Sequence, residues 1–333
     1  MEIFNLRDIP QNVLVAEHPD PANPRFIDSI KRGLELLSRR AKFNLEIVPS
    51  PRNESEANQL VREFNDDTEI IVLGGDGTVR GLYTAMHNAG LRNLRLNALG
   101  GGGACDFARQ VHTNHKARSL DKVLRSPALP HKPILTTVEH PDIDALDNRI
   151  EIVSSLYFAL GFTARMAEIY NQPEFRESVR GINPGSRKFI QGFEILKTIK
   201  HADLFDLEYE NRPPAEVGEY VFPNGSRMAG GIVRFKGNPF FGPQFGELAV
   251  GEINYPNFVK GLARATFGLY TKHQDGEEVR FKVSSKDEAP ILYQSDGESG
   301  TFPSGSIVSV RLDDAVVNTV TSNAFDIGLD QAA

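Results

Sequence analysis

The first 125 residues alternate short apolar runs with segments whose apolar residues recur every three or four positions. The apolar runs predict strands at 12–16, 43–48, 70–73 and 94–99. The helical spacing predicts helices from Phe26 onward, around 57–64 and over 79–89. Short apolar strands that alternate with amphipathic helices are typical of a parallel sheet covered on both faces. We therefore expect an α/β region in this part of the chain.

The pattern changes after Pro127, where strand-like runs begin to dominate. Apolar and polar residues alternate one by one at 205–210, 279–283 and 308–312, which is the period of a half-buried strand. Clusters of Pro, Asn, Asp and Gly between such runs indicate turns. One helical pattern, at about 186–200, interrupts the strands. We predict a mainly antiparallel β-sandwich over residues 128–310.

Composition narrows the classes of protein that fit. The 333 residues suggest two domains, and the net charge of −7 with dispersed Lys and Arg argues against an extended nucleic-acid surface. No apolar run approaches the length of a membrane span, and the first ten residues lack an apolar signal core. A single cysteine, Cys105, excludes an intramolecular disulfide framework. The expected location is the cytoplasm.

The stretch Gly74-Gly75-Asp76-Gly77-Thr78 lies between a predicted strand and a predicted helix. Glycine lets backbone N–H groups approach a charged oxygen, and the start of the helix adds partial positive charge, so the turn is suited to phosphate. A carboxylate among phosphates must face a cation or a hydroxyl, which points to magnesium or polar support at Asp76. The alternative is a tight turn in which Asp76 caps the helix.

A second glycine cluster, Gly100 to Gly103, also follows a predicted strand and precedes a helix-like segment that starts near Asp106. Two such turns at neighbouring strand ends could enclose one polyphosphate. The alternative is a flexible connector, which does not explain why order resumes at once in Asp106-Phe107-Ala108-Arg109.

These residues resemble a known family. GGDGT at 74–78 and LGGGGACDFAR at 99–109 are similar to the two glycine motifs of the diacylglycerol kinase catalytic-domain superfamily, which includes bacterial lipid kinases and the sphingosine and ceramide kinases. Further similar stretches are Gly161-Phe-Thr-Ala, Asn224-Gly225 and Gln294-Ser-Asp-Gly-Glu298. GGDGT alone is also found in NAD kinases.

The resemblance implies an α/β nucleotide-binding domain at 1–127, to which about 312–333 returns, and a β-sandwich lipid-substrate domain at 128–311. It implies an active cleft between the two and a kinase that transfers the γ-phosphate of ATP, with Mg²⁺, to a lipid hydroxyl. The acceptor would be a diacylglycerol, a sphingoid base, a ceramide or a related lipid.

The resemblance also assigns roles to residues. Catalysis falls to Asp296, the proposed base, with Glu298 and Asp76, and the last two would also hold the metal. The nucleotide-binding residues would be Asn23, Gly74, Gly75, Asp76, Gly77, Thr78, Gly101, Gly102 and Asp106. From the sequence alone, Asp296-Gly297 favours a hairpin turn over a catalytic role, and the resemblance reverses this preference.

Other functions stay open, because GGDGT is shared with NAD kinases and because three departures from the family pattern allow a protein that has lost turnover. The Asn23-Pro24 stretch lacks the usual glycines, Cys105 replaces an Asn, and Phe245 stands where the family has a metal-binding Asp. The alternatives are an NAD kinase-type enzyme with a soluble substrate, and a nucleotide- or lipid-binding protein without turnover.

Two expectations concern partners. A lipid kinase must meet its substrate at a bilayer, so we expect peripheral membrane contact, with a homodimer left open. Phe240 and Phe241 in the loop after Asn238 either contact acyl chains or plug the end of the sandwich.

Overall fold

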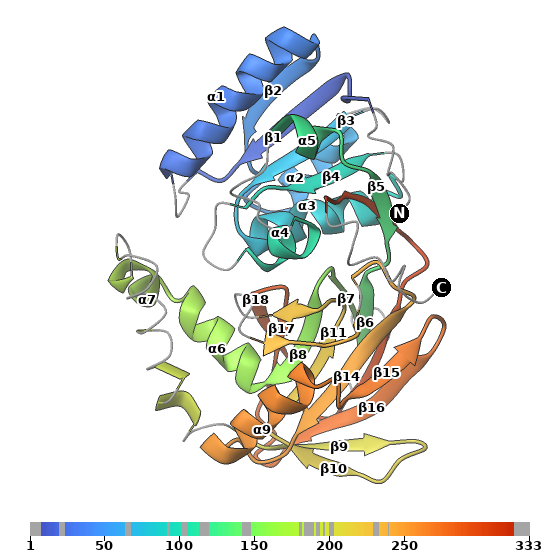
Figure 1. The fold of residues 1–333 in the computed structure, drawn as a ribbon. Coiled ribbons are helices and arrows are strands. Elements are labelled where there is room, and N and C mark those ends of the chain that lie inside the picture. The colour runs from blue at the N-terminus through green and yellow to red at the C-terminus, as the bar shows by residue number, and fades with distance from the viewer. Residues whose placement is uncertain are drawn as a thin grey trace.

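The computed structural model describes residues 8–19, 24–63, 68–91, 94–100, 105–112, 120–141, 148–179, 182, 190, 194–195, 197–199, 203–228, 233–238 and 240–322. Within these ranges the chain forms an upper part around one sheet and a lower part around two further sheets (Figure 1). No helix in these ranges is long and apolar enough to cross a bilayer. The predicted fold class, an α/β region followed by an antiparallel β region, is confirmed.

The upper sheet contains β1 (Asn12–Glu17), β2 (Asn44–Pro49), β3 (Thr68–Leu73), β4 (Arg95–Ala98), β5 (Ala128–His131) and β20 (Val317–Val320). Their order is β2-β1-β3-β4-β20-β5, and all neighbours are parallel except β20 and β5. Every residue of β3 is buried, as expected for a central strand covered on both faces. The four strands predicted in this region are therefore present.

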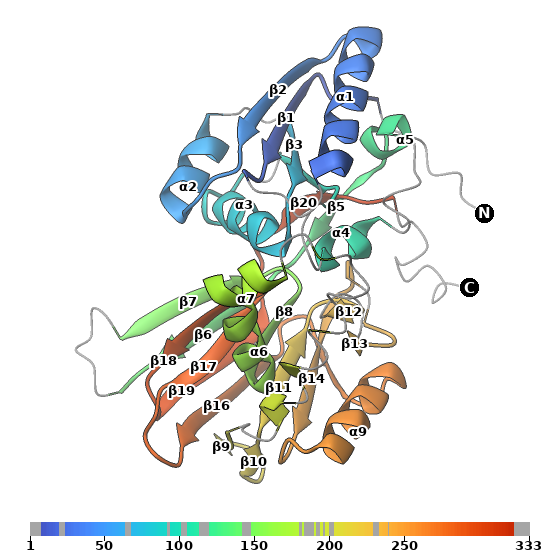
Figure 2. The same cartoon turned by 90° about the vertical axis from the view of Figure 1, so that its left-hand side faces the viewer.

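Helices cover both faces of the upper sheet (Figure 2). They are α1 (Pro24–Ala41), α2 (Glu54–Arg62), α3 (Asp76–Asn88), α4 (Asp106–Val111) and α5 (Leu120–Leu124). Alternate residues of β3 point to opposite faces of the upper sheet. Ile70 and Val72 pack with α2, α3 and α4, whereas Ile71 and Leu73 pack with α1 and α5. The period-2 geometry of a strand thus explains why β3 reads as a continuous apolar run.

The lower part is a sandwich of two antiparallel sheets. One has the order β10-β9-β16-β19-β6-β7 and the other β15-β14-β11-β8-β17-β18. The first comprises β6 (Ile134–Glu139), β7 (Arg149–Ser154), β9 (Phe205–Tyr209), β10 (Ala215–Val217), β16 (Glu278–Ser285) and β19 (Ser306–Leu312). The second comprises β8 (Tyr157–Gly161), β11 (Glu219–Pro223), β14 (Gln244–Val250), β15 (Thr271–Gln274), β17 (Ile291–Ser295) and β18 (Glu298–Phe302).

The apolar residues of the alternating runs fill the space between these two sheets. Phe281 of β16 lies 5.1 Å from the ring of Tyr220 and 6.1 Å from that of Phe222, both on β11 of the facing sheet. Alternation of inward apolar and outward polar side chains is therefore what places β9, β16 and β19 in a sandwich.

Three helices and a hairpin lie outside the sandwich core. They are α6 (Phe162–Asn171), α7 (Pro173–Ser178), α9 (Tyr255–Thr266) and the pair β12 (Arg227–Met228) and β13 (Val233–Arg234). Most of the helix expected at about 186–200 falls outside the described residues, and so does the stretch 142–147, which contains Asp142, Asp144 and Asp147.

The chain passes twice between the two parts. After β19 it returns to the upper sheet, where β20 is parallel to β4 and antiparallel to β5. The division into domains at 127 and 312 stays a prediction.

Glu219 on β11 is a buried carboxyl that meets the start of α6. Its Oε2 accepts the N–H of Thr163 at 2.6 Å, while its Oε1 has no hydrogen-bond partner among the described residues. Burial raises the pKa of Glu219 to about 8, although the bonds from Thr163 and Phe162 oppose this shift. The folded protein therefore holds a proton at neutral pH that the unfolded chain releases near pH 4.5.

Replacing Glu219 by Gln is expected to stabilise the protein increasingly as pH rises from about 5 to 8. In this range the folded wild type binds more protons than the unfolded chain, so its free energy of unfolding falls with pH, whereas Gln cannot ionise. The gain should reach about 2–4 kcal/mol at pH 8. Urea unfolding of both proteins across this range measures it, and parallel pH profiles would contradict the prediction.

Candidate functional site

The Gly74–Thr78 turn joins β3 to α3 at the carboxyl edge of the upper sheet. Helix α3 begins at Asp76, with Gly75 as its extended N-terminal cap, so the glycine turn is itself the start of the helix. A Cβ at Gly74 would come within 2.7 Å of the Thr78 hydroxyl oxygen. Glycine is therefore needed at position 74 for space.

Asp76 connects the two predicted phosphate turns. One oxygen of its carboxylate accepts the N–H of Asp106 at 3.0 Å, and the other accepts the N–H of Phe107 at 2.9 Å. Both donors are at the start of α4, which follows the second glycine cluster. Asp76 thus caps α4 as well as opening α3, and it fixes the position of one turn relative to the other.

Part of the predicted nucleotide site falls outside the described residues, namely Asn23, Gly101 and Gly102. The second turn is described at its two ends. Gly100 has a φ of 81° and Cys105 a φ of 53°, so the backbone is left-handed on both sides. Cys105 is buried in the core beneath α4.

Asp296 lies in the two-residue hairpin between β17 and β18. Its φ of 50° and the φ of 96° at Gly297 allow the tight turn that pairs Ser295 with Glu298. The hairpin expected from the sequence is therefore present. The Asp296 side chain, however, points into the protein and is only 1% exposed.

The Asp296 carboxylate is held by the turn between β7 and β8. One oxygen accepts the N–H and the hydroxyl of Ser155 at 2.6 and 2.8 Å, and the other accepts the N–H groups of Leu156 and Tyr157 at 2.8 and 3.0 Å. These four donors use the roughly four acceptor positions of a carboxylate. Burial raises the pKa of Asp296, although these bonds act to lower it.

Glu298 brings the hairpin against the glycine turn. Its exposed carboxylate lies so close to Gly77 that a Cβ on Gly77 would overlap the Oε1 atom. A second contact comes from Arg80 of α3, whose Nε donates to the Ser295 hydroxyl at 3.2 Å. Residues more than 200 positions apart in the chain thus meet at the boundary between the upper and lower parts.

The electrostatics of this boundary are those of an acidic site. Burial, and after it the charge of Asp106, raises the pKa of Asp76 to about 7, although the N–H groups of Asp106 and Phe107 act to lower it; the charge of Asp296 adds a smaller upward contribution. Burial is the largest cause that raises the pKa of the Tyr157 phenol, and the charges of Asp106, Asp76 and Asp296 raise it further. A cation would relieve the repulsion among these groups.

The donor set suits magnesium. Mg²⁺ prefers oxygen ligands and is usually held by one or two carboxylates together with phosphate oxygens and water. The candidate carboxylate ligands are Asp76, which precedes Gly77 in the chain, and the exposed Glu298, which lies against Gly77. No group of three or more His, Cys, Asp or Glu side chains that could hold a metal occurs among the described residues, so this pair would need phosphate or water to complete a shell.

Sequence reasoning missed the residues that support Asp296. The turn at Ser155–Tyr157 binds mainly through backbone N–H groups, which leave no signal in side-chain identity. Asn224, noted only for its resemblance, donates to the carbonyls of Ser155 and Lys132 at 3.2 and 2.8 Å and so fixes this turn. Asn171 at the end of α6 donates to the Gly297 carbonyl at 2.9 Å.

Phe240 is an interior aromatic residue. It stacks on His131 with centroids 3.8 Å apart and packs edge-on against Phe107 of α4, and it is only 2% exposed. Phe240 is therefore an interior plug between the upper and lower parts, and it lacks the exposure that an acyl-chain contact would require. Phe241 is partly buried beside it.

Phe245 also lies in the interior, stacked on His273 with centroids 5.0 Å apart. Two residues on, Glu247 accepts hydrogen bonds from His273, Arg212 and Tyr220. Burial acts to raise the pKa of Glu247, but these three bonds outweigh it and lower the pKa to about 2. The region where the family pattern has a metal-binding Asp is occupied here by an aromatic stack and an ion-pair cluster.

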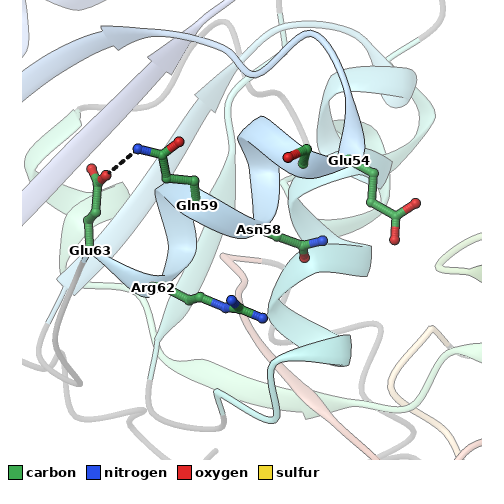
Figure 3. Close-up of a pocket in the computed structure, with 6 residues that line it drawn as sticks. Glu54, Asn58, Gln59, Arg62 and Glu63 are labelled. Atoms are coloured by element: carbon green, nitrogen blue, oxygen red, sulfur yellow. Dashed lines mark hydrogen bonds between the residues drawn. The ribbon is translucent and has the colours of Figure 1, made fainter.

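A separate hollow lies on the outer side of α2 (Figure 3). Its volume is about 670 Å³, and its lining residues are Glu54, Ser55, Asn58, Gln59, Arg62 and Glu63. All six come from one helix and its final turn, so no second element closes over a ligand there. The converging carboxylates at the α3 boundary make the stronger site.

Comparison with known proteins agrees with this geometry. Residues 22–130 match the family model described as the diacylglycerol kinase catalytic domain. A solved structure of a candidate diacylglycerol kinase from Bacillus anthracis str. Sterne is 17% identical, with a TM-score of 0.62 over 94% of this chain and 98% of that chain. A second such structure from the same organism is 16% identical, with a TM-score of 0.63 over 94% and 96%.

At these identities the solved structures show a common fold. The chain matches none of the curated proteins with which it was compared. The resemblance carried by the glycine turns is confirmed over residues 22–130.

Proposed function

Because residues 22–130 match the family model described as the diacylglycerol kinase catalytic domain, we propose that this protein is an ATP-dependent lipid kinase. It transfers the γ-phosphate to a hydroxyl of a diacylglycerol, a sphingoid base, a ceramide or a related lipid. The observation that carries the proposal is the contact between the Glu298 carboxylate and Gly77, which joins the acidic hairpin of the lower part to the glycine turn of the upper part.

The upper part binds the nucleotide in this proposal. Backbone N–H groups of the GGDGT turn and the second glycine turn receive the phosphates, and the start of α3 adds favourable partial charge. The residues involved are Asn23, Gly74, Gly75, Gly77, Thr78, Gly101, Gly102 and Asp106. Asp76 and Glu298 hold Mg²⁺, which when bound neutralises charge on the phosphates.

Asp296 accepts the proton of the lipid hydroxyl. Of its four donors, only the Ser155 hydroxyl can turn away without moving the backbone. When it turns, the substrate hydroxyl takes its place on that oxygen. The proton passes to Asp296, the substrate oxygen bonds to the γ-phosphorus, and the bond from that phosphorus to the bridging oxygen breaks to release ADP.

A binding protein without turnover is the second candidate function. The observation that favours it is the complete set of four donors on Asp296, because a carboxylate with no open acceptor position cannot take a proton. The two functions differ in whether Ser155 releases its bond.

Labelled ATP separates these functions. Purified protein with Mg²⁺ is given diacylglycerol, sphingosine, ceramide, phosphatidylglycerol or NAD, and the products are separated. We expect label in one lipid class, and Ser155→Ala should keep activity within about tenfold of the wild type because it removes only the competing donor. Label in NAD alone would indicate a soluble-substrate kinase. Nucleotide binding without any labelled product would indicate the binding protein.

We propose that the protein works at the periphery of a membrane, in the cytoplasm. Its proposed substrates differ in solubility, since ATP is in water whereas the lipid acceptor is in a bilayer. Self-association into a homodimer stays a prediction.

A further inference from the structure

Exposed apolar side chains gather at one place on the lower part. Seven large apolar side chains are exposed among the described residues, and four of them lie between positions 255 and 269. They are Tyr255, Val259, Phe267 and Leu269, with Phe267 69% exposed. The first two belong to α9, and the other two to the turn between α9 and β15. Such a cluster indicates an interaction surface more than a single exposed residue does.

The spacing of α9 explains why these residues share a face. Successive residues of a helix are about 100° apart around its axis. Gly261 and Ala265 are buried against the sandwich, and Phe258 and Leu262 line a small cavity beneath the helix. Val259, Lys260, Arg264 and Phe267 fall on the opposite half, where each is exposed, and Tyr255 is exposed at the first position of the helix. The helix is amphipathic, but its outer half is partly apolar and partly basic.

The charged side chains of α9 itself are all positive, and the exposed Glu252 lies just before the helix. Residues 253–272 contain no Asp or Glu, although the whole protein carries a net charge of −7. Lys260 and Arg264 extend from α9, while Lys236 and Lys272 flank the Phe267–Leu269 turn. All four are exposed, and none of them is in an ion pair with a described residue.

We propose that this α9 surface, formed by Tyr255, Val259, Lys260, Arg264, Phe267 and Leu269 with Lys236 and Lys272, docks the protein on the surface of an anionic bilayer. Aromatic and aliphatic side chains enter the headgroup boundary, and the four cations meet lipid phosphates. A second copy of the chain fits less well, because a two-fold interface would place the same positive charges against each other.

The position of α9 connects docking to the proposed catalytic site. Helices α6 and α9 both lie on the outer side of the second sandwich sheet, and Phe162 of α6 packs edge-on against Phe258 of α9 at 5.6 Å. The far end of α6 holds the catalytic hairpin through the bond from Asn171 to Gly297. The inference deepens the proposed function by naming its membrane surface, but binding is measured without ATP or turnover.

Cosedimentation with vesicles tests the proposal. Vesicles of phosphatidylcholine alone and of phosphatidylcholine with phosphatidylglycerol are mixed with the full-length protein. The wild type should bind the anionic vesicles, and binding should weaken as salt is raised. The double variant Lys260→Gln, Arg264→Gln should lower the binding constant on the order of tenfold or more. The double variant Phe267→Ser, Leu269→Ser should lower it at every salt concentration.

Helix α1 supplies matched controls for both double variants. Leu36 is 68% exposed, nearly the same as Phe267, and Arg39 and Arg40 are exposed basic residues at the end of α1. Leu36→Ser and the pair Arg39→Gln, Arg40→Gln should leave vesicle binding within about twofold of the wild type. Circular dichroism verifies that all variants fold.

Three results would overturn the proposal. They are no binding of the wild type to anionic vesicles, equal losses in the α9 and α1 variants, and self-association that the α9 variants abolish in size-exclusion chromatography. A labelled lipid product in detergent micelles together with any of these results would leave the kinase function standing. Vesicle binding by the α9 surface without a labelled product would support membrane docking and would contradict the kinase function.

Discussion

Asp296→Asn is expected to reduce the rate of lipid phosphorylation by about 10²–10⁴-fold. The variant keeps the size and shape of the side chain, but an amide cannot accept the substrate proton. Phosphate transfer from labelled ATP, measured with the lipid class that the wild type uses, gives the loss directly. Activity near that of the wild type would show that Asp296 is not the base.

A structural effect must be separated from this chemical one. In Asp296→Asn the amide NH₂ would face two of the donors that now approach the carboxylate, so the free energy of unfolding should fall by about 1–3 kcal/mol. Assays are therefore run well below the melting temperature of the variant. ADP affinity serves as the control, because the glycine turns are untouched and should bind ADP as the wild type does. A variant that has lost both ADP binding and activity would indicate a collapsed site.

Gly77→Ala is expected to lower kcat by about 10- to 100-fold while leaving the fold intact. The new methyl group would overlap the Glu298 carboxylate, and that flexible side chain would swing away from the glycine turn. Stability should stay unchanged or rise by up to about 0.5 kcal/mol, because Gly77 is the second residue of α3, where alanine is favoured over glycine less strongly than in a helix interior. A fall in activity without a loss of stability distinguishes a displaced Glu298 from damage to the helix.

Gly81→Ala is the matched control for this prediction. Gly81 lies one turn further along α3, and a Cβ there would meet no atom within 4 Å. It should gain about 0.5–1 kcal/mol of stability, as expected for a helix interior, and keep full activity. Steady-state kinetics and thermal unfolding of the two variants provide the comparison. Equal activity in both would mean that the position of Glu298 is unimportant for catalysis.

The elements of the upper sheet could be predicted because each one carries its own pattern. The run Ile70–Leu73 is apolar at every position since β3 is covered on both faces, and the alternating run 279–283 marks β16 since only one of its faces is buried. Asp296-Gly297 was recognisable as a hairpin from two residues, because positive φ angles favour this pair.

The support of the site could not be predicted in the same way. Nothing in Ser155, Leu156 and Tyr157 signals that their backbone N–H groups converge on a carboxylate some 140 positions later. The sequence left open whether the loop containing Phe240 contacts acyl chains or forms a plug, because its partners, His131 and Phe107, come from other parts of the chain. Contacts of this kind depend on which surfaces face each other after folding.

The sequence by itself determined the alternation of strands and helices, the sandwich pattern and the two glycine turns, because local periodicity and backbone freedom are properties of neighbouring residues. Only the tertiary structure decided that Glu298 lies on Gly77 and that Asp76 caps α4. It also decided that the apolar and basic residues of α9 face outward together. Packing of the two parts sets these distances, and packing is a property of the whole chain.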